Sequence, residues 1–300
     1  MLLTWSTAAC LTVCLIGLTA LLRPGRSTWS AWVAPLAWEA AIVFALYTLW
    51  QKAGDMAVTH VQGATGHALW VWRVEKDLHL PSERDLQSLV LPHPHLVEFL
   101  NGYYAVVHVP ALVVFLVWLF LRHPESYRRW RNVGALLTGA ALLIQLIPVA
   151  PPRLMPQLGF VDTALRYGES VYGAGGIRNA PQLAAMPSLH VGWAVFVALV
   201  TIVVSTSRWR WLILAHPVMT VLAVVATANH WWLDGIVAAA LLPLAILIEA
   251  GARRVLRPLW AKMRVWSPIE LPPDPAPEPN PEPAPIVARQ ITPAPASGTR

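Results

Sequence analysis

The chain has 300 residues, of which 56% are hydrophobic and 13% are charged, and its mean hydropathy is +0.51. The apolar residues lie in long blocks rather than in amphipathic stripes, which excludes an ordinary soluble domain and indicates a membrane protein. The net charge of +6 is concentrated in short segments beside these blocks, so it indicates topology and not binding to nucleic acid.

Apolar blocks long enough to span a bilayer recur along the whole chain. The first block has no basic residue ahead of it and no convincing cleavage site after it, so we interpret it as a retained span. The predicted fold class is an all-α, polytopic transmembrane bundle of about seven spans. The blocks are 2–22, 29–50, 100–121, 133–150, 191–204, 211–228 and 232–250.

Two segments are not expected to span. In VWRVEKDLHLPSERDLQSLV, residues 71–90, apolar residues alternate with charge around a Pro-Ser break, which predicts two short interfacial helices. Two roles are left open for these helices: they could simply cover the bundle, or they could gate the access of substrate. Beyond Trp266 the chain is rich in proline, glutamate and small residues, which predicts a disordered tail.

The basic residues indicate which way the chain faces. Four groups of them, within 23–26, 122–131, 208–210 and 253–264, fall on one side of a bundle of seven spans. By the positive-inside rule this side is cytoplasmic, so we expect the N-terminus outside and the C-terminal tail inside. The polar segments 51–99 and 151–187 and the junction around Asn229 then lie outside.

Three polar clusters meet on that outer side. They are Arg153 in PVAPPRLMP, Ser188 and His190 in MPSLH, and His230 and Asp234 in TANHWWLD. Although they are distant in sequence, the alternation of spans puts them at one membrane depth. Ionisable residues are costly in a membrane, so this convergence indicates a functional site.

Each residue type in these clusters suits a phosphate ester at the membrane surface. Pro187 fits the first turn of a helix, whose free N–H groups, together with the Ser188 hydroxyl, can bind an anion. Arg153 offers a permanent charge and a fork of donors for phosphate oxygens. His230 and Asp234 are one helical turn apart, so the carboxylate can fix the imidazole as a nucleophile, while His190 protonates the leaving oxygen. No metal or other cofactor is required.

Other interpretations of these residues are available. A lone histidine such as His60, His67 or His108 is usually a packing or interface residue, and Arg153 alone could anchor a loop to lipid headgroups. The many tryptophans are typical of an interfacial belt. A different class of function is a non-enzymatic haem protein with histidines of neighbouring spans as axial ligands, although Asp234 and Arg153 would add nothing to it.

These residues resemble the type-2 phosphatidic acid phosphatase superfamily, whose pattern is KxxxxxxRP, PSGH and SRxxxxxHxxxD. The resemblance implies that His190 is the acid, that His230 is the nucleophile that becomes phosphorylated, and that Asp234 orients it. MPSLH departs from the pattern at the glycine, and APPR lacks the following proline and the preceding lysine. The third-motif arginine would fall on Val224, so another residue must bind phosphate there.

For that missing phosphate ligand we prefer Arg178 over Arg166, because Arg178 is nearer to the predicted helix start, and His108 is a further candidate ligand. The motifs AAMPSLH, APPR and NHWWLD, with NGYYAVVHVP and YRRWRN, are similar to the inositol phosphorylceramide synthase (aureobasidin-resistance) branch. The similarity extends from about residue 75 to residue 250.

The resemblance implies a metal-independent lipid phosphatase or phosphotransferase of the cell membrane with a lipid phosphate as substrate, and the distribution of basic residues predicts that its site is extracytoplasmic. Inositol-phosphate transfer is one such reaction, and the acceptor is left open. We therefore divide the chain into two N-terminal spans (1–52), an extracytoplasmic amphipathic segment (53–99), a catalytic transmembrane core (100–252) and a basic, then proline-rich, cytoplasmic tail (253–300).

Overall fold

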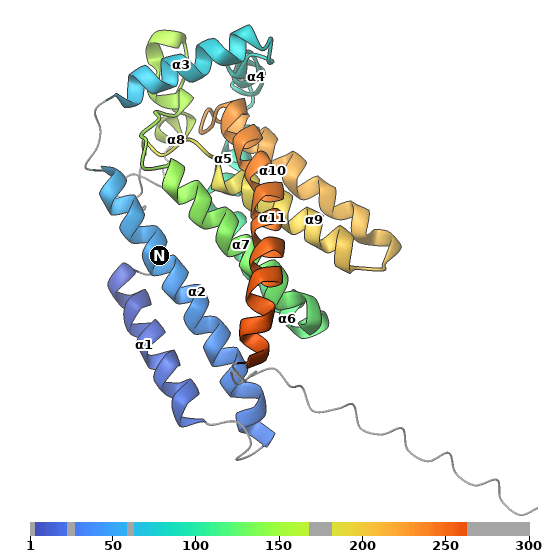
Figure 1. Cartoon of the computed structure of the whole chain (residues 1–300). Helices are drawn as coiled ribbons and strands as arrows, with labels where there is room; N and C mark the ends of the chain where they lie inside the picture. The colour runs from blue at the N-terminus through green and yellow to red at the C-terminus, as the bar shows by residue number, and fades with distance from the viewer. Residues whose placement is uncertain (1–3, 23–27, 59–62, 168–181, 263–300) are drawn as a thin grey trace, which may run out of the picture. The chain divides into compact units, whose positions relative to one another are not determined.

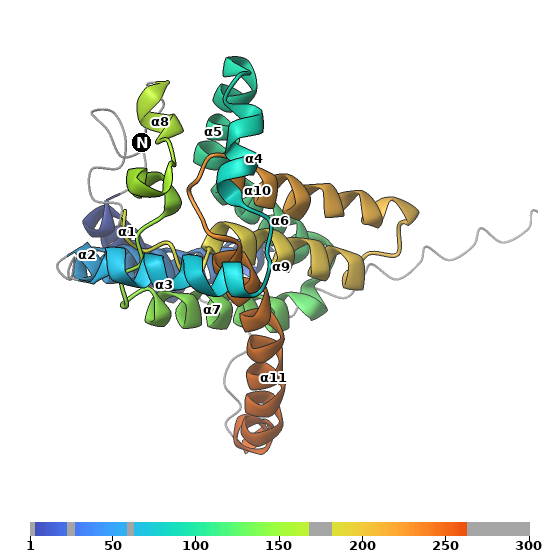
Figure 2. The same cartoon turned by 90° about the horizontal axis from the view of Figure 1, so that it is seen from above.

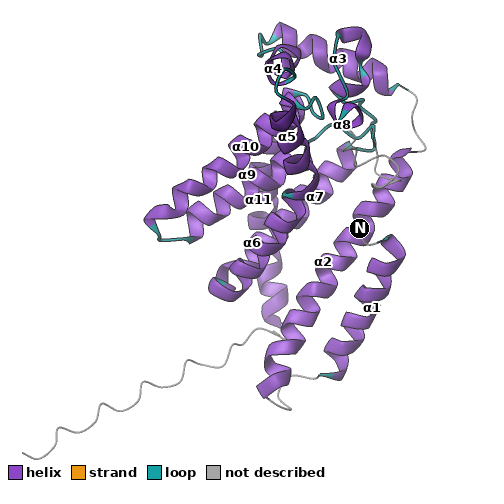
Figure 3. Ribbon diagram, turned by 180° about the vertical axis from the view of Figure 1, so that it is seen from behind, coloured by secondary structure: helices purple, strands orange, loops and turns teal. Residues whose placement is uncertain are grey.

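Helices make up most of the computed structural model, which describes residues 4–22, 28–58, 63–167 and 182–262 (Figures 1 and 3). Within these ranges no strand forms, and the one isolated β-bridge joins Val149 to Ala184. The predicted all-α class is therefore confirmed. The α-helices are α1 Trp5–Leu21, α2 Thr28–Val58, α3 Ala64–Asp77, α4 Glu83–Val90, α5 Pro94–Val106, α6 His108–Arg122, α7 Pro124–Ile144, α8 Thr163–Arg166, α9 Leu189–Val204, α10 Ala215–Ala226 and α11 Trp232–Lys262. Three short 3-10 helices are η1 Pro152–Leu154, η2 Pro156–Leu158 and η3 Arg208–Leu214.

Local sequence sets where several of these helices begin. Ser82, Asp162 and Ser188 are N-caps whose side chains accept a hydrogen bond from a first-turn amide of α4, α8 and α9. Pro94 and Pro124 open α5 and α7, where the missing N–H of proline leaves no helical bond unmade. The boundaries of the site-bearing helices therefore follow from capping chemistry.

The predicted third span, residues 100–121, is not one straight helix. α5 and α6 meet at Val107 and are bent by 48°. Pro110 lies three residues beyond this break, and it can neither donate to the carbonyl of Val106 nor fit its ring against that carbonyl. Residues 100–121 were predicted as one apolar span; the structure divides this stretch into two helices at Val107, and the bend follows from Pro110.

Two helices of the described chain are long and apolar enough to cross a membrane, or three if the bent pair α5–α6 is one span. They are Arg208–Ala226 and Trp232–Val255. Three shorter apolar helical stretches are Trp5–Leu21, Val33–Leu49 and Leu189–Val204. The number of seven spans stays a prediction, since a 16-residue helix such as α9 rises only about 24 Å.

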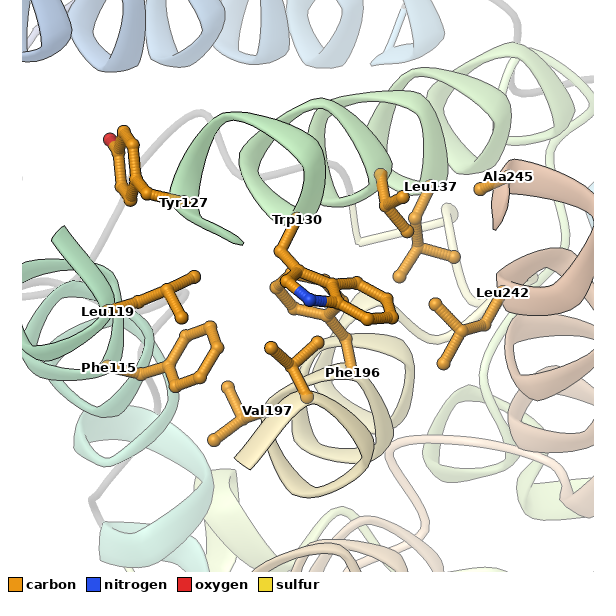
Figure 4. Packing of buried hydrophobic residues seen from close by; sticks show 11 residues of the cluster. Phe115, Leu119, Tyr127, Trp130, Leu137, Phe196, Val197, Leu242 and Ala245 are labelled. Atoms are coloured by element: carbon orange, nitrogen blue, oxygen red, sulfur yellow. The ribbon is translucent and has the colours of Figure 1, made fainter. Parts of the chain in front are cut away.

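A hydrophobic cluster of α6, α7, α9 and α11 forms the core that supports the site (Figure 4). Trp130 of α7 and Phe196 of α9 lie in its middle, with Phe115 and Leu242 beside them. Gly134 permits this packing, because a Cβ there would lie 3.2 Å from the Phe196 ring. The middle of α9 is thus held against both α7 and α11.

The two amphipathic helices predicted in residues 71–90 are present as α3 and α4, and Pro81 and Ser82 separate them as expected. They lie at the end of the bundle where α11 begins (Figures 1 and 2). The indole N–H of Trp232 donates to the carbonyl of Pro81 at 2.7 Å. The loop between α3 and α4 is therefore attached directly to the first residue of α11.

Candidate active site

A histidine with a fixed tautomer lies at the centre of the candidate site. The Nδ1 atom of His230 is 2.9 Å from the carbonyl oxygen of Ala185 and 3.2 Å from Oδ2 of Asp234. Both neighbours are acceptors, so Nδ1 carries the proton. The opposite nitrogen, Nε2, is buried and has no hydrogen-bond partner among the described residues. It is therefore left with a free lone pair, as a nucleophile requires.

Asp234 joins this histidine to the start of α11. Its Oδ2 also accepts from the amide of Trp231 at 2.8 Å, and the side chain is fully buried. The turn before it contains Ala228 in the left-handed conformation, with φ of +57°. His230 therefore lies two residues before α11 begins, and the turn brings its ring into contact with the carboxylate of Asp234.

His190 approaches His230 from the first turn of α9. The centroids of the two imidazole rings are 5.6 Å apart. The Nδ1 atom of His190 is buried and makes no hydrogen bond in the described structure. The amide of Ser188 donates to the backbone carbonyl of Asp234 at 3.0 Å, which locks the start of α9 to the start of α11. The two histidines are thus held together by the ends of two neighbouring helices.

Arg153 reaches the same place from the segment after α7. Its amide donates to the carbonyl of Ala228 at 2.8 Å, and its Nε donates to Oδ1 of Asn229 at 3.0 Å. Nη1 forms an ion pair with Asp162 at 3.1 Å, and the arginine is only 5% exposed. Asn229 directly precedes His230, so the guanidinium is held next to the catalytic candidate.

Ser188 is placed differently from the expectation. Its hydroxyl accepts from the amide of Val191 at 3.4 Å and caps α9, while Pro187 precedes the cap instead of standing in the first turn. The prediction for Pro187 was wrong because Ser188 takes the N-cap position. The amides of Leu189 and His190 are the first-turn donors that a helix leaves without intrahelical acceptors, so they are the ones able to bind an anion. Ser188 as a phosphate ligand stays a prediction.

For the missing third-motif arginine, the structure describes one of the two candidates. Arg178 lies outside the described residues. Arg166 belongs to α8, where its guanidinium lies 5.8 Å from the ring centroid of Tyr167. Val224 is buried in an apolar cluster, and its carbonyl accepts from the amides of Asn229 and His230 at 2.9 and 3.1 Å.

An aromatic and histidine group covers the other side of His190. The rings of Tyr104 and His108 each lie 4.5 Å from it, centroid to centroid. Nδ1 of His108 contacts the carbonyl of Tyr104 at 3.1 Å, and its Nε2 is buried with no partner in the described ranges. His108 is thus at the site, where its role as a ligand stays a prediction.

Sequence reasoning missed several of these contacts. Asn229 and Asp162, which hold Arg153, were not singled out, although Asn229 stands beside His230 in the motif NHWWLD. Asp162 carries no motif of its own, and only the folded chain pairs it with Arg153. Tyr104 was present in the quoted stretch NGYYAVVHVP, but its contact with His190 depends on how α5 packs against α9.

A helical membrane protein with a buried His–Asp pair beside a second histidine and an arginine has the features of a membrane phosphatase. Comparison with known families agrees with this class. A model described as the PAP2 superfamily matches residues 69–248, so the chain belongs to this superfamily. The membership supports a phosphatase-type enzyme of lipid metabolism over a haem protein. No curated protein and no solved structure matches the chain significantly.

Proposed function

We propose that this protein is a lipid phosphatase or phosphotransferase that works through a phosphohistidine on His230. The observation that carries the proposal is the state of His230: two acceptors hold Nδ1, and the buried Nε2 has no partner in the described structure. His190, which suits an acid, lies 5.6 Å from His230 between ring centroids, and Arg153, which suits a phosphate ligand, bonds the neighbouring Asn229. Membership in the PAP2 superfamily supports the same chemistry.

In the first step, Nε2 of His230 attacks phosphorus and the bond from phosphorus to the lipid oxygen breaks. Protonated His190 gives its proton to that oxygen, so the lipid leaves as an alcohol. Asp234 stabilises the positive charge that develops on the imidazole. Arg153 and the first-turn amides of α9 bind the phosphate oxygens, which carry more negative charge in the transition state.

In the second step, an acceptor hydroxyl gives its proton to His190 and attacks phosphorus, and the bond to Nε2 breaks. When the substrate is a lipid phosphate monoester and water is the acceptor, the product is inorganic phosphate. When the substrate is a phosphodiester, the headgroup phosphate stays on Nε2 after the lipid alcohol leaves, and a second lipid alcohol accepts it. The motifs AAMPSLH and NHWWLD favour the second, synthase-like branch, in which inositol phosphate is one transferable group. We place the reaction at the extracytoplasmic leaflet on the basis of the charge distribution.

The test uses the full chain, purified in detergent in the presence of EDTA. It is incubated with prenyl, diacylglycerol and inositol-containing lipid phosphates, and both free phosphate and new lipid products are measured. We expect turnover of at least one lipid, and its loss in His230→Ala. His95→Ala is the matched control, because the side chain of His95 is 99% exposed and contacts Glu98 on the surface of α5. Turnover that survives in His230→Ala, or a Soret band in the purified protein, would contradict the proposal.

A further inference from the structure

Three carboxyl groups surround the start of α11. The amide of Trp231 donates to Asp234, the amide of Trp232 donates to Glu83 at 3.3 Å, and the amide of Leu233 donates to Glu75 at 2.7 Å. Glu75 comes from α3 and Glu83 is the first residue of α4. The two amphipathic helices therefore supply caps for α11, which carries Asp234 and directly follows the turn with His230, and carboxyl groups suit this positive helix end.

Glu75 and Glu83 are buried to an unusual degree for glutamates, with 3% and 4% of their surface exposed. The carboxyl of Glu83 faces that of Glu75, and Asp234 adds a third acid nearby. Oε2 of Glu75 is buried and receives no hydrogen bond in the described structure. Two buried carboxyl groups that face each other are stable when one proton lies between them, because the proton removes the repulsion and supplies the missing donor.

In the described part of the chain, the basic residues beside this pair form no ion pair with it. Lys76, the neighbour on α3, places its ammonium over the ring of Trp72, 3.8 Å from the centroid. Arg84, on α4, turns toward Gly159, where its Nε lies 2.9 Å from the position of a Cβ. Both line a cavity of about 150 Å³ together with Asp85, and neither forms an ion pair with Glu75 or Glu83 in the described chain.

We propose that Glu75 and Glu83 are positioning residues that share one proton and fix the start of α11, and with it His230 and Asp234, for catalysis. The inference rests on the proposed function, and it assigns a role to α3 and α4. When the shared proton is lost, the negative carboxylates of Glu75 and Glu83 face each other beside Asp234, and Oε2 of Glu75 has no donor in the described structure. The first turn of α11 then loses its fixed position, and Asp234 no longer holds His230 in line.

The electrostatic environment agrees with this arrangement. Burial, and next the contact with Glu83, raise the pKa of Glu75 to about 9. The folded protein therefore holds the proton up to about this pH, whereas the unfolded chain releases it near the ordinary carboxyl pKa. Between these two pKa values the folded state binds one more proton than the unfolded state. The stability that the pair contributes therefore falls as pH rises, and it is fully lost above a pH of about 9.

Glu75→Gln is the informative variant, because its amide oxygen still accepts from Leu233 and its NH₂ group donates permanently in place of the shared proton. We expect wild-type kcat to fall as pH rises through about 9, and Glu75→Gln to lose this alkaline limb. Glu75→Ala should lower kcat about 10- to 100-fold at neutral pH with KM nearly unchanged. Asp85→Asn is the matched control, which should keep both the limb and the neutral-pH rate.

Thermal unfolding tests the pair independently of any activity. Tm of Glu75→Gln minus Tm of wild type should increase as pH rises from about 5 to 9, because only wild type loses proton-linked stability there. Asp85→Asn should show no such increase. If wild type has no lipid phosphatase or transferase activity but the Tm difference appears, the proposed function fails while the shared proton stands. A Tm difference that is constant with pH, or an alkaline limb retained in Glu75→Gln, would overturn the inference.

Discussion

His230 makes two contacts at Nδ1, and they come from different parts of the chain. Asp234 is four residues away, while Ala185 stands before α9. The carboxylate supports the charge that forms on the ring, and the carbonyl fixes the direction in which Nε2 points. Removing the carboxylate should therefore affect the chemistry more than the fold.

Asp234→Asn keeps the size of the side chain but can present its NH₂ group to Nδ1, which favours the wrong tautomer. We expect kcat to fall by about four orders of magnitude, as it does when the acid of a Ser-His-Asp triad is replaced in the same way. Circular dichroism and Tm should stay close to wild type. An equal loss of fold and rate would mean that Asp234 is structural.

Among the contacts between individual site residues, the sequence predicted those between residues that are close along the chain. The four-residue spacing of His230 and Asp234 keeps them within reach of each other, although His230 lies in the turn before α11 and not on the helix itself. The partners of Arg153 could not be predicted in this way. Asn229 is 76 residues away from it, and Asp162 approaches it only through the turns formed by η1 and η2.

Among the helices, the contact of α9 with α11 decides how far apart His190 and His230 lie. Gly192 lies two residues after His190, and a Cβ on it would be 3.5 Å from Cβ of Ala238 and 3.8 Å from the side chain of Leu137. This close approach lets α9 pack between α7 and α11. A larger side chain must push α9 away, and His190 with it.

Gly192→Leu should therefore lower both stability and turnover. Overpacking of a tight contact costs about 1–3 kcal/mol, which should appear as a lower Tm in detergent. Gly192→Ala is the control, because its methyl group fits at ordinary contact distance and should keep most of the activity. If the leucine variant has the Tm and kcat of wild type, the close packing of α9 on α11 is not what positions His190.

The amphipathic pattern and the Pro-Ser break predicted α3 and α4 from local sequence alone. Their contribution to the start of α11 was not predictable, since Glu75 and Glu83 read as solvent-facing charges in an amphipathic pattern. Their burial depends on how α3 and α4 cover α11, more than 140 residues later in the chain. The bend at Val107 was missed although its cause, Pro110, is visible in the sequence.

Over the whole molecule, composition predicted the helical membrane class, and the PAP2 superfamily match agrees with it. The basic residues taken as topology signals also make structural contacts: Arg131 of α7 pairs with Glu39 of α2, and Arg129 approaches Glu249 of α11. Orientation in a bilayer depends on the lipid and on insertion, so helix packing alone does not give it. It stays a prediction from the charge distribution.

A pair of reporter fusions tests that orientation. A reporter fused after Arg210 should be cytoplasmic, and one inserted near Gly173 should be external. The same pair of fusions in a variant that is inactive through His230→Ala serves as the control, because topology does not depend on catalysis. The opposite pattern would place the active site on the cytoplasmic face and exclude lipids of the outer leaflet as substrates.

The most direct test of the central claim is to trap the intermediate on His230. Wild-type protein is mixed with lipid substrate labelled at phosphorus and quenched rapidly, and the labelled residue is identified. We predict an acid-labile, base-stable phosphoenzyme with the label on His230, no label in His230→Ala, and longer-lived label in His190→Ala when dephosphorylation is followed, because His190 also activates the acceptor. Label that stays on the His230→Ala protein, or normal turnover by that variant, would contradict the account.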